Sequence, residues 1–226
     1  MGFRAAASAP PTDGDPDMPT LQHSDPARAR HEAPADSPLA SFEALARCID
    51  EWACDRPSAA AALLWRRSAE AALIARRAGA CDALITAALW HRLGDFALAA
   101  GAGRSAAPQA AAAPQVGADL LSDLYPPLVT ETIRLQTSAH RYLATGNAVS
   151  LGQLAFADSG RRGWAPRPMS EAERVGFASV PFAMNAIRLC RWTLAATGDA
   201  VAAGELQMLY RIAERSVCND GFGWGG

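Results

Sequence analysis

The stretch that decides the fold is residues 87–95, Ala87-Ala88-Leu89-Trp90-His91-Arg92-Leu93-Gly94-Asp95. It continues a nearly unbroken apolar run, so the pattern predicts the end of a buried helix. His91 stands at that end, and Gly94 three residues later permits a turn of the backbone. A histidine followed at once by an aspartate at such a point would form the centre of a metal site between helices. Arg92 occupies the second position here, and much of the functional interpretation follows from that change.

The composition favours a helical, cytoplasmic protein. Alanine dominates the 226 residues, aromatic residues are few, and the formal net charge is −2, which gives no reason to expect nucleic acid or an anionic membrane as a partner. The five cysteines include no C-x-x-C pair, and an odd number without a disulfide framework fits a reducing compartment. No apolar run approaches the roughly 20 residues of a membrane helix, and no signal-peptide pattern begins the sequence.

Changes in composition divide the chain into three parts. Residues 1–38 are rich in Pro, Asp, Ala and Ser without apolar periodicity, which is typical of a disordered tail. His23 and His31 lie in this tail and make a poor metal site. Residues 39–216 carry helical periodicity and should form one domain. Residues 217–226 are rich in glycine and aromatic residues and should form a flexible tail.

The domain should be an all-α, multi-helix orthogonal bundle, because no credible strand pattern appears. Ser41 and Ser58 are candidate N-caps, and Ser170 and Glu173 have the spacing of a capping box. Residues 100–115 have low complexity and are expected to form a mobile loop. Helices are expected at about 42–52, 59–78, 82–98, 116–124, 127–146, 181–197 and 201–216.

Three segments together resemble the HD-domain superfamily: residues 83–95, 125–143 and 168–192. Within that superfamily, the small HD-domain proteins associated with phosphonate breakdown are the most similar. The resemblance implies an HD-domain-like fold with two metal ions, often iron, held by histidines and aspartates from four helices. It also implies hydrolysis of a phosphoester or oxidative cleavage of a small phosphonate.

Most of the ligand positions implied by this resemblance hold other residues. His91 keeps one histidine, Arg92 replaces the aspartate that would bridge the metals, and Arg67 falls near the upstream ligand histidine. Three further positions are also changed: Asp95 stands where a supporting histidine is usual, Gln136 replaces a histidine, and Thr193 replaces the closing aspartate. A two-iron site needs anionic ligands to offset about four or five positive charges, so two arginines there oppose metal binding. We therefore expect no metal and no cofactor, and iron only if the chain is an active enzyme.

His91 has a structural and a functional interpretation. As a core histidine its ring would be satisfied by a backbone carbonyl or a side chain, which we prefer to a lone ligand or base. Asp95 is expected to pair with Arg92 and so close the former metal site. His140 lies four residues after Gln136 on the same helix face, where a ligand pair is a weaker alternative.

Two arginine pairs and three cysteines are further candidates for a functional role. In the functional interpretation the pairs Arg66-Arg67 and Arg161-Arg162 receive a phosphate, but a solvated basic face is preferred. Three cysteines are interpreted as ordinary core or near-core thiols: Cys48, Cys81 and Cys190.

The last ten residues carry side chains that a solubilising tail would not need. They include a cysteine, an Asn-Asp pair and two aromatic residues among glycines: Cys218, Asn219, Asp220, Phe222 and Trp224. This segment either packs back over the fold or faces a partner. A peptide-modifying enzyme is one such partner, with the helical domain as the leader of a ribosomal peptide precursor.

Three functions follow from these observations. The leading one is a pseudoenzyme that acts as a folded scaffold or leader and presents residues 217–226 to a protein partner, for example a tailoring enzyme. The second is a metal-dependent HD-domain phosphohydrolase or oxygenase that acts on a small phosphorylated or phosphonate compound. The third is a sensor of phosphate or another small molecule that uses the vacated site lined by Arg67, Arg92 and Gln136.

Overall fold

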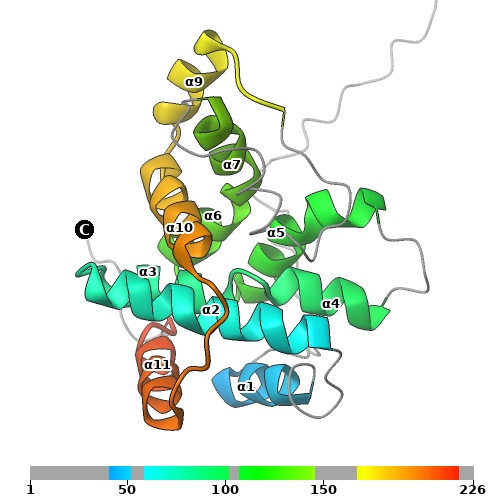
Figure 1. The fold of residues 1–226 in the computed structure, drawn as a ribbon, viewed down its shortest axis with the longest axis vertical. Helices are drawn as coiled ribbons and strands as arrows, with labels where there is room; N and C mark the ends of the chain where they lie inside the picture. Colours follow the sequence, from blue (N-terminus) through cyan, green and yellow to red (C-terminus); the bar gives the residue numbers. More distant parts are fainter. Residues whose placement is uncertain (1–40, 52–58, 102–106, 146–166, 219–226) are drawn as a thin grey trace, which may run out of the picture. The chain divides into compact units, whose positions relative to one another are not determined.

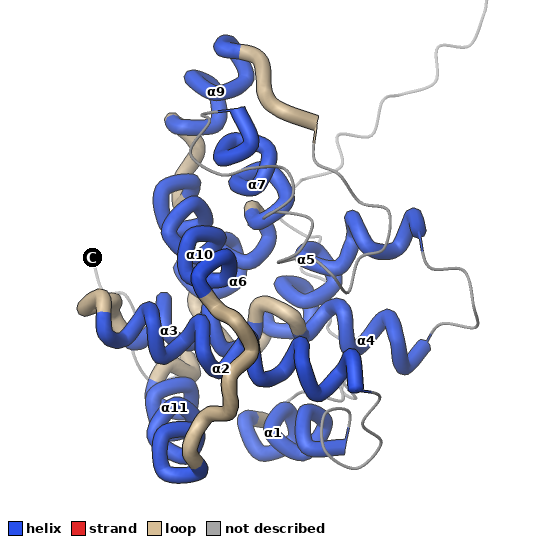
Figure 2. Tube along the Cα trace, in the orientation of Figure 1, coloured by secondary structure: helices blue, strands red, loops and turns tan. Residues whose placement is uncertain are grey.

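The computed structural model describes residues 41–51, 59–101, 107–145 and 167–218, all within the compact unit Asp36–Gly226. All regular structure in these ranges is helical, which confirms an all-α, multi-helix bundle (Figure 1, Figure 2). The expectations for residues 1–38, Ser58, Arg161-Arg162 and residues 219–226 lie outside the described residues. The helices are α1 (Phe42–Asp50), α2 (Ala59–Arg77), α3 (Asp82–Trp90), α4 (Leu93–Gly101), α5 (Ala107–Leu121), α6 (Pro127–Arg134), α7 (Gln136–Thr145), α9 (Glu171–Ala178), α10 (Ala183–Ala195) and α11 (Ala203–Arg215).

Helix α3 is the central helix of the bundle. Every residue from Leu84 to Trp90 is buried, as the apolar pattern predicts. Four helices pack against it, namely α2, α6, α10 and α11. Because α3 has no solvated face along this stretch, its position fixes the positions of its neighbours.

An aromatic cluster joins α3 to the surrounding elements. The ring of Trp90 stacks on Trp65 of α2 at 6.0 Å between centroids and lies 5.9 Å from Tyr210 of α11. The indole Nε1 of Trp90 donates a hydrogen bond to the hydroxyl of Tyr125 at 3.1 Å. Burial raises the pKa of the Tyr125 phenol, so this hydroxyl stays neutral. The cluster therefore fixes the end of α3, where the chain turns at His91.

The buried helix ends at His91, as the stretch 87–95 predicts, whereas the single helix expected over 82–98 is wrong. Helix α3 ends at Trp90 and α4 begins at Leu93 after a two-residue turn. The turn directs α4 against α5, where a Cβ on Gly94 would clash with the backbone carbonyl of Ala113 and lie 2.7 Å from the amide of Gly117. Gly94 is therefore required for the close approach of two helices rather than for a turn of the backbone.

The prediction of a mobile loop over residues 100–115 is wrong for residues 107–115. Helix α5 already begins at Ala107 and includes Pro114. Alanine has the highest helix propensity, so an alanine-rich, low-complexity sequence still forms a helix. Pro108 lies in the first turn, where a backbone N–H has no helical partner to lose.

The single helix expected over 127–146 is also wrong, because it is broken at Leu135 into α6 and α7. The break has a packing reason. Ile133 of α6 belongs to the main hydrophobic core around α3, whereas Ala139 and Leu143 of α7 belong to a second cluster with α9 and α10. The two helices must therefore run in different directions. No glycine or proline lies between them, so the sequence gives no local signal for this break.

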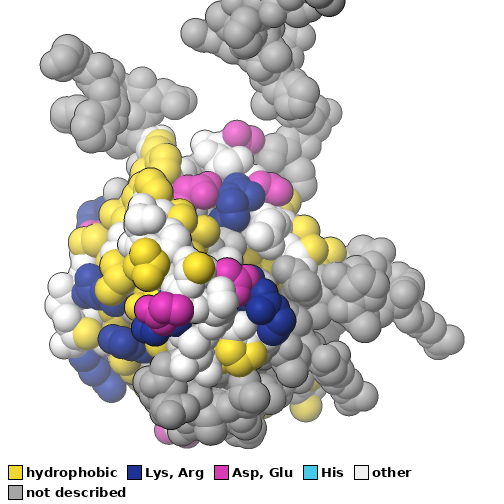
Figure 3. Space-filling model, turned by 90° about the horizontal axis from the view of Figure 1, so that it is seen from above, with side chains coloured by type: hydrophobic (Ala, Val, Ile, Leu, Met, Phe, Trp, Pro, Cys, Tyr) yellow, Lys and Arg dark blue, Asp and Glu magenta, His cyan; other side chains and the backbone are white. Residues whose placement is uncertain are grey.

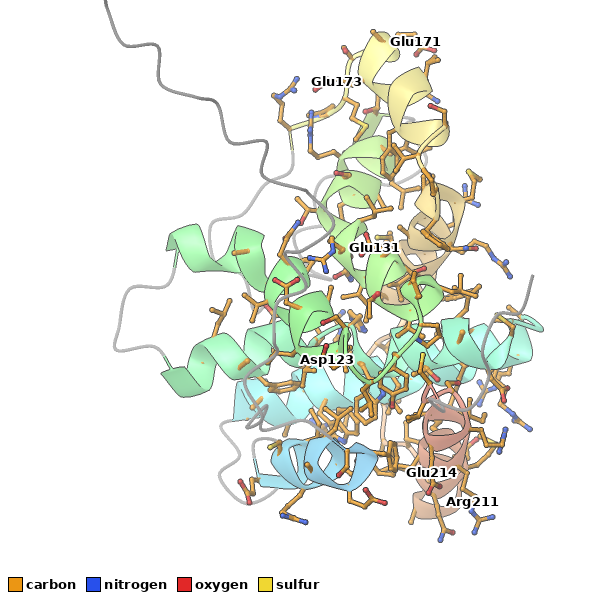
Figure 4. All side chains as sticks on the ribbon, turned by 180° about the vertical axis from the view of Figure 1, so that it is seen from behind. Asp123, Glu131, Glu171, Glu173, Arg211 and Glu214 are labelled. Carbon is orange, nitrogen blue, oxygen red and sulfur yellow. The ribbon has the colours of Figure 1, made fainter. Side chains whose placement is uncertain are left out.

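Helix α9 is held by the predicted capping box. Ser170 accepts a hydrogen bond from the Glu173 amide, and Glu173 accepts one from the Ser170 amide at 2.7 Å (Figure 4). The Glu173 carboxylate also accepts hydrogen bonds from Arg141 of α7 at 2.7 Å and Arg167 at 2.6 Å. The backbone hydrogen bond of Ser170, followed by these two guanidinium groups, lowers the pKa of Glu173 to about 2. One carboxylate thus joins α7, the segment before α9 and α9 itself.

Replacement of Gly94 tests the α4–α5 contact. We expect Gly94→Ala to lower the free energy of unfolding by about 3 kcal/mol or more, because the added methyl group must displace the backbone of α5. Gly204→Ala in α11 is the matched control, since a Cβ there meets open space. Urea denaturation measures both variants, and an unchanged midpoint for Gly94→Ala would contradict the contact.

Candidate functional site

His91 is a core residue at the end of α3. Its side chain is 2% exposed, and its Nδ1 lies 2.8 Å from the carbonyl oxygen of Ala88. A ring nitrogen at this distance from a carbonyl oxygen carries the proton and donates it. The ring is therefore held by the helix that bears it, as the structural interpretation of this histidine predicts.

Arg92 and Asp95 form the ion pair expected from the sequence. Arg92 Nη1 lies 3.3 Å from Asp95 Oδ2, and the exposed fractions of the two side chains are 3% and 10%. The pair spans the turn between α3 and the first turn of α4. In this position a guanidinium group and not a carboxylate points into the protein next to His91.

Arg67 is buried in the middle of α2, with 5% of its surface exposed. The solvated basic face preferred for Arg66-Arg67 is therefore wrong for Arg67 and correct only for Arg66, which is exposed. A Cβ on Gly198 would lie 3.2 Å from Arg67 Cγ, so the stem of this arginine packs against the backbone that follows α10. Gly198 has a φ of 95°, a conformation that a larger side chain would strain.

Glu70, one turn further along α2, is a residue that the sequence analysis missed. Its Oε2 accepts hydrogen bonds from the amides of Gly198 at 2.7 Å and Asp199 at 3.3 Å. Its Oε1 accepts one from the Thr197 hydroxyl at 3.2 Å. Helix α2 therefore holds the segment between α10 and α11 through a carboxylate and the stem of a buried arginine.

A second group of buried polar side chains lies between α7 and α10. The Sγ of Cys190 donates to the backbone oxygen of Gln136 at 3.6 Å, and the Thr193 hydroxyl donates to the backbone oxygen of Cys190 at 2.9 Å. His140, one turn after Gln136, is also buried. Gln136 of α7 therefore lies beside Cys190 of α10, and Thr193 lies one turn further along α10.

The Gln136 side chain is the least satisfied polar group in this contact. The residue is 0% exposed, and neither its Oε1 nor its Nε2 has a hydrogen-bond partner in the part of the chain that the structure describes. A buried amide without partners destabilises a protein by about 1–3 kcal/mol. Gln136 is therefore a local cost to the stability of the α7–α10 contact.

The described interior is basic. Its buried charged or titratable nitrogen-bearing side chains are Arg67, Arg92, His91 and His140, and no aspartate or glutamate among the described residues is buried. The described residues also contain no group of three or more His, Cys, Asp or Glu side chains that could hold a metal ion. Buried arginines favour an anion or a neutral polar group over a cation.

The cysteines occupy different environments. Cys190 is buried and Cys48 is half-buried, as expected, but Cys81 is exposed at the N-cap of α3. The interpretation of Cys81 as a core thiol is therefore wrong, because residue 81 precedes the buried part of the helix.

Residues 216–218 leave the last helix along a fixed path. The Thr86 hydroxyl of α3 donates to the Ser216 hydroxyl at 3.1 Å, and Arg215 pairs with Asp82 at 3.0 Å. Val217 packs against the main core, and the Cys218 amide donates to the carbonyl of Leu124 at 2.9 Å. The Cys218 side chain is exposed. Four predicted site residues that follow lie outside the described residues: Asn219, Asp220, Phe222 and Trp224.

No protein-family model matches this chain, and no curated protein matches it. The likeness to HD-domain proteins, with the roles it implies for Arg67, His91 and Thr193, therefore stays a prediction from the sequence. No helix in the described part of the chain is both long and apolar enough to cross a membrane.

Removal of Asp95 tests the buried ion pair. We expect Asp95→Ala to lower the free energy of unfolding by about 3 kcal/mol, because it leaves the Arg92 guanidinium buried without its carboxylate. Glu171→Ala is the matched control, since Glu171 and Arg174 have the same spacing but Glu171 is largely exposed. That change should cost about 0.5 kcal/mol or less. Equal losses in a denaturation experiment would show that the Arg92–Asp95 pair is not buried in solution.

Proposed function

We propose that this chain is a pseudoenzyme with HD-domain-like ancestry that acts as a folded scaffold or leader. In this proposal residues 217–226 face a protein partner, such as a peptide-modifying enzyme. The observation that carries the proposal is the anchored start of this segment, where the Cys218 amide is bonded to Leu124 and the Cys218 side chain is exposed.

An anchored start has a physical advantage for a presented segment. Residues joined to a fixed point are held at a high effective concentration near any partner that is bound to the same domain. Glycines between the functional side chains let the backbone enter a narrow site. The thiol, amide, carboxylate and aromatic side chains of residues 218–224 are groups that tailoring enzymes modify.

The buried charges support a non-catalytic role. At two positions that the resemblance assigns to metal ligands, the interior carries Arg67 and Arg92, and the latter is paired with Asp95. A dinuclear metal site would bring several further positive charges next to these guanidinium groups. The proposal places the protein in the cytoplasm, in agreement with the free thiols of Cys48, Cys81 and Cys218.

Peptide mass spectrometry tests the role of residues 217–226. We expect the C-terminal proteolytic peptide, from protein isolated from the cells that naturally make it, to carry a mass shift on one of residues 218–224. The peptide that contains Cys81 is the matched control, because that thiol is also exposed and reports non-specific oxidation. A C-terminal peptide without any shift, or with only the shift seen at Cys81, would contradict a modified segment.

A second candidate function is a sensor of phosphate or a small polar molecule, and the unsatisfied Gln136 amide favours it. If this amide belongs to a binding site, inorganic phosphate should raise the melting temperature of the wild type but not of Gln136→Leu. In buffer alone, Gln136→Leu should be more stable by about 1–3 kcal/mol, because it removes two unsatisfied buried atoms. An equal effect of phosphate on both proteins would contradict this candidate.

A further inference from the structure

The exposed surface of α9 and α10 is unusually apolar for this protein. Among the described residues, the large apolar side chains that are exposed are Val175 at 65%, Val180 at 39% and Met184 at 56%. All three lie within ten residues of one another in the sequence, on α9, on the turn after it and on α10. In Figure 3, which views the end of the bundle that carries α9, apolar side chains form a band with both basic and acidic side chains beside it.

No charge interrupts this surface. Residues 175–187 contain no charged side chain, and several of the exposed ones between the large apolar residues are small, including Gly176, Ser179 and Pro181. A Cβ on Gly176 would meet no atom within 4 Å. A group of exposed large apolar side chains this close together in the chain is typical of an interaction site in a soluble protein.

The border of this surface is basic. One stripe of α10 carries Met184, Arg188 and Arg191, because residues at positions i, i+4 and i+7 lie on the same face of a helix. Residues 174–198 contain three arginines and no acidic residue. Arg174 is paired with Glu171 at 2.9 Å, but Arg191 has no ion-pair partner in the described part of the chain. Arg188 lies over the Trp192 ring at 5.3 Å, which leaves its charge on the surface.

The corner between α9 and α10 is held in one geometry. Phe182, the N-cap of α10, has a φ of 64° although it is not glycine. Such a conformation is strained for a residue with a side chain and persists only where the surrounding packing demands it. Glu173 fixes the other end of α9 to Arg141 of α7. Val175 and Met184 are therefore presented from a rigid corner, which lowers the entropic cost of binding.

We propose that this α9–α10 surface, formed by Val175, Gly176, Val180, Met184, Arg188 and Arg191, docks an acidic amphipathic helix of a partner protein. The apolar side chains of that helix contact Val175, Val180 and Met184, and its carboxylates lie opposite Arg188 and Arg191. This complementarity of charge identifies the partner. The proposal does not rest on the role of residues 217–226.

Two other occupants fit the surface less well. A symmetric contact through this surface with a second copy of this chain would offer its arginines no carboxylate from residues 174–198. Adsorption to a membrane relies on large side chains such as Trp, Phe and Leu, whereas the exposed side chains here are two valines and one methionine.

Gly176→Glu is the sharpest test, because the new side chain fits the fold but repels an acidic ligand. The probe is a labelled synthetic helix of about 20 residues, with leucines on one face and glutamates on the other. Fluorescence anisotropy should show that this peptide binds the wild type and that Gly176→Glu weakens binding at least tenfold. Gly204→Glu, the same change at an open position of α11, should leave the affinity unchanged.

Arg191→Glu provides a second variant, on the basic border. It should also weaken binding of the acidic peptide. A peptide with lysines in place of the glutamates should bind Arg191→Glu more tightly than it binds the wild type. The proposal is overturned if the acidic peptide does not bind the wild type, or if Gly204→Glu weakens binding as much as Gly176→Glu. A third result would also overturn it: the peptide does not bind, but vesicles of phosphatidylserine and phosphatidylcholine bind the wild type and do not bind Gly176→Glu. That result would identify a membrane as the partner of this surface.

Discussion

The packing of Trp90 is the interaction on which the rest of this structure depends. Its indole ring contacts Trp65 and Tyr210, and its Nε1 donates to the hydroxyl of Tyr125, so one side chain joins α2, α3, α11 and the entry to α6. Because the end of α3 is fixed in this way, the following residues must turn. That turn buries His91 and directs α4 against α5 at Gly94.

The chemistry of the interior follows from this turn. It places the Arg92 guanidinium inside the protein, beside the core histidine and opposite Asp95. Together with Arg67, it gives the bundle a basic centre, while Gln136 adds an amide without partners. These features support a scaffold, with a small-molecule sensor as the alternative. The external features of interest are the anchored Cys218 and the α9–α10 surface, which lie on different elements and can serve different partners.

Local signals were sufficient to predict much of the fold. Ser41 caps α1, and Ser170 and Glu173 form the capping box of α9, because each motif acts within four residues of itself. The buried character of α3 followed from its lack of a polar face. The break at Leu135 was not predictable, since it arises from packing against two separate clusters.

In the candidate site, too, the sequence predicted the local contacts but not the long-range ones. The Arg92–Asp95 pair and the contact of His91 with the backbone of its own helix are local, and both were expected. The burial of Arg67 and the role of Glu70 were not, because both depend on residues 197–199, more than 120 positions away in the sequence. Only the folded chain brings these residues together, so no pattern in the sequence of α2 indicates them.

The metal content of the protein tests the central claim most directly. The protein would be equilibrated with Fe²⁺ or Mn²⁺ without oxygen, freed of unbound metal and measured by inductively coupled plasma mass spectrometry. A basic interior around Arg67 and Arg92 predicts far less than one equivalent of metal and no change in melting temperature. Two equivalents, lost on replacement of His91 by alanine in a variant that still folds, would contradict it and identify an active metal centre.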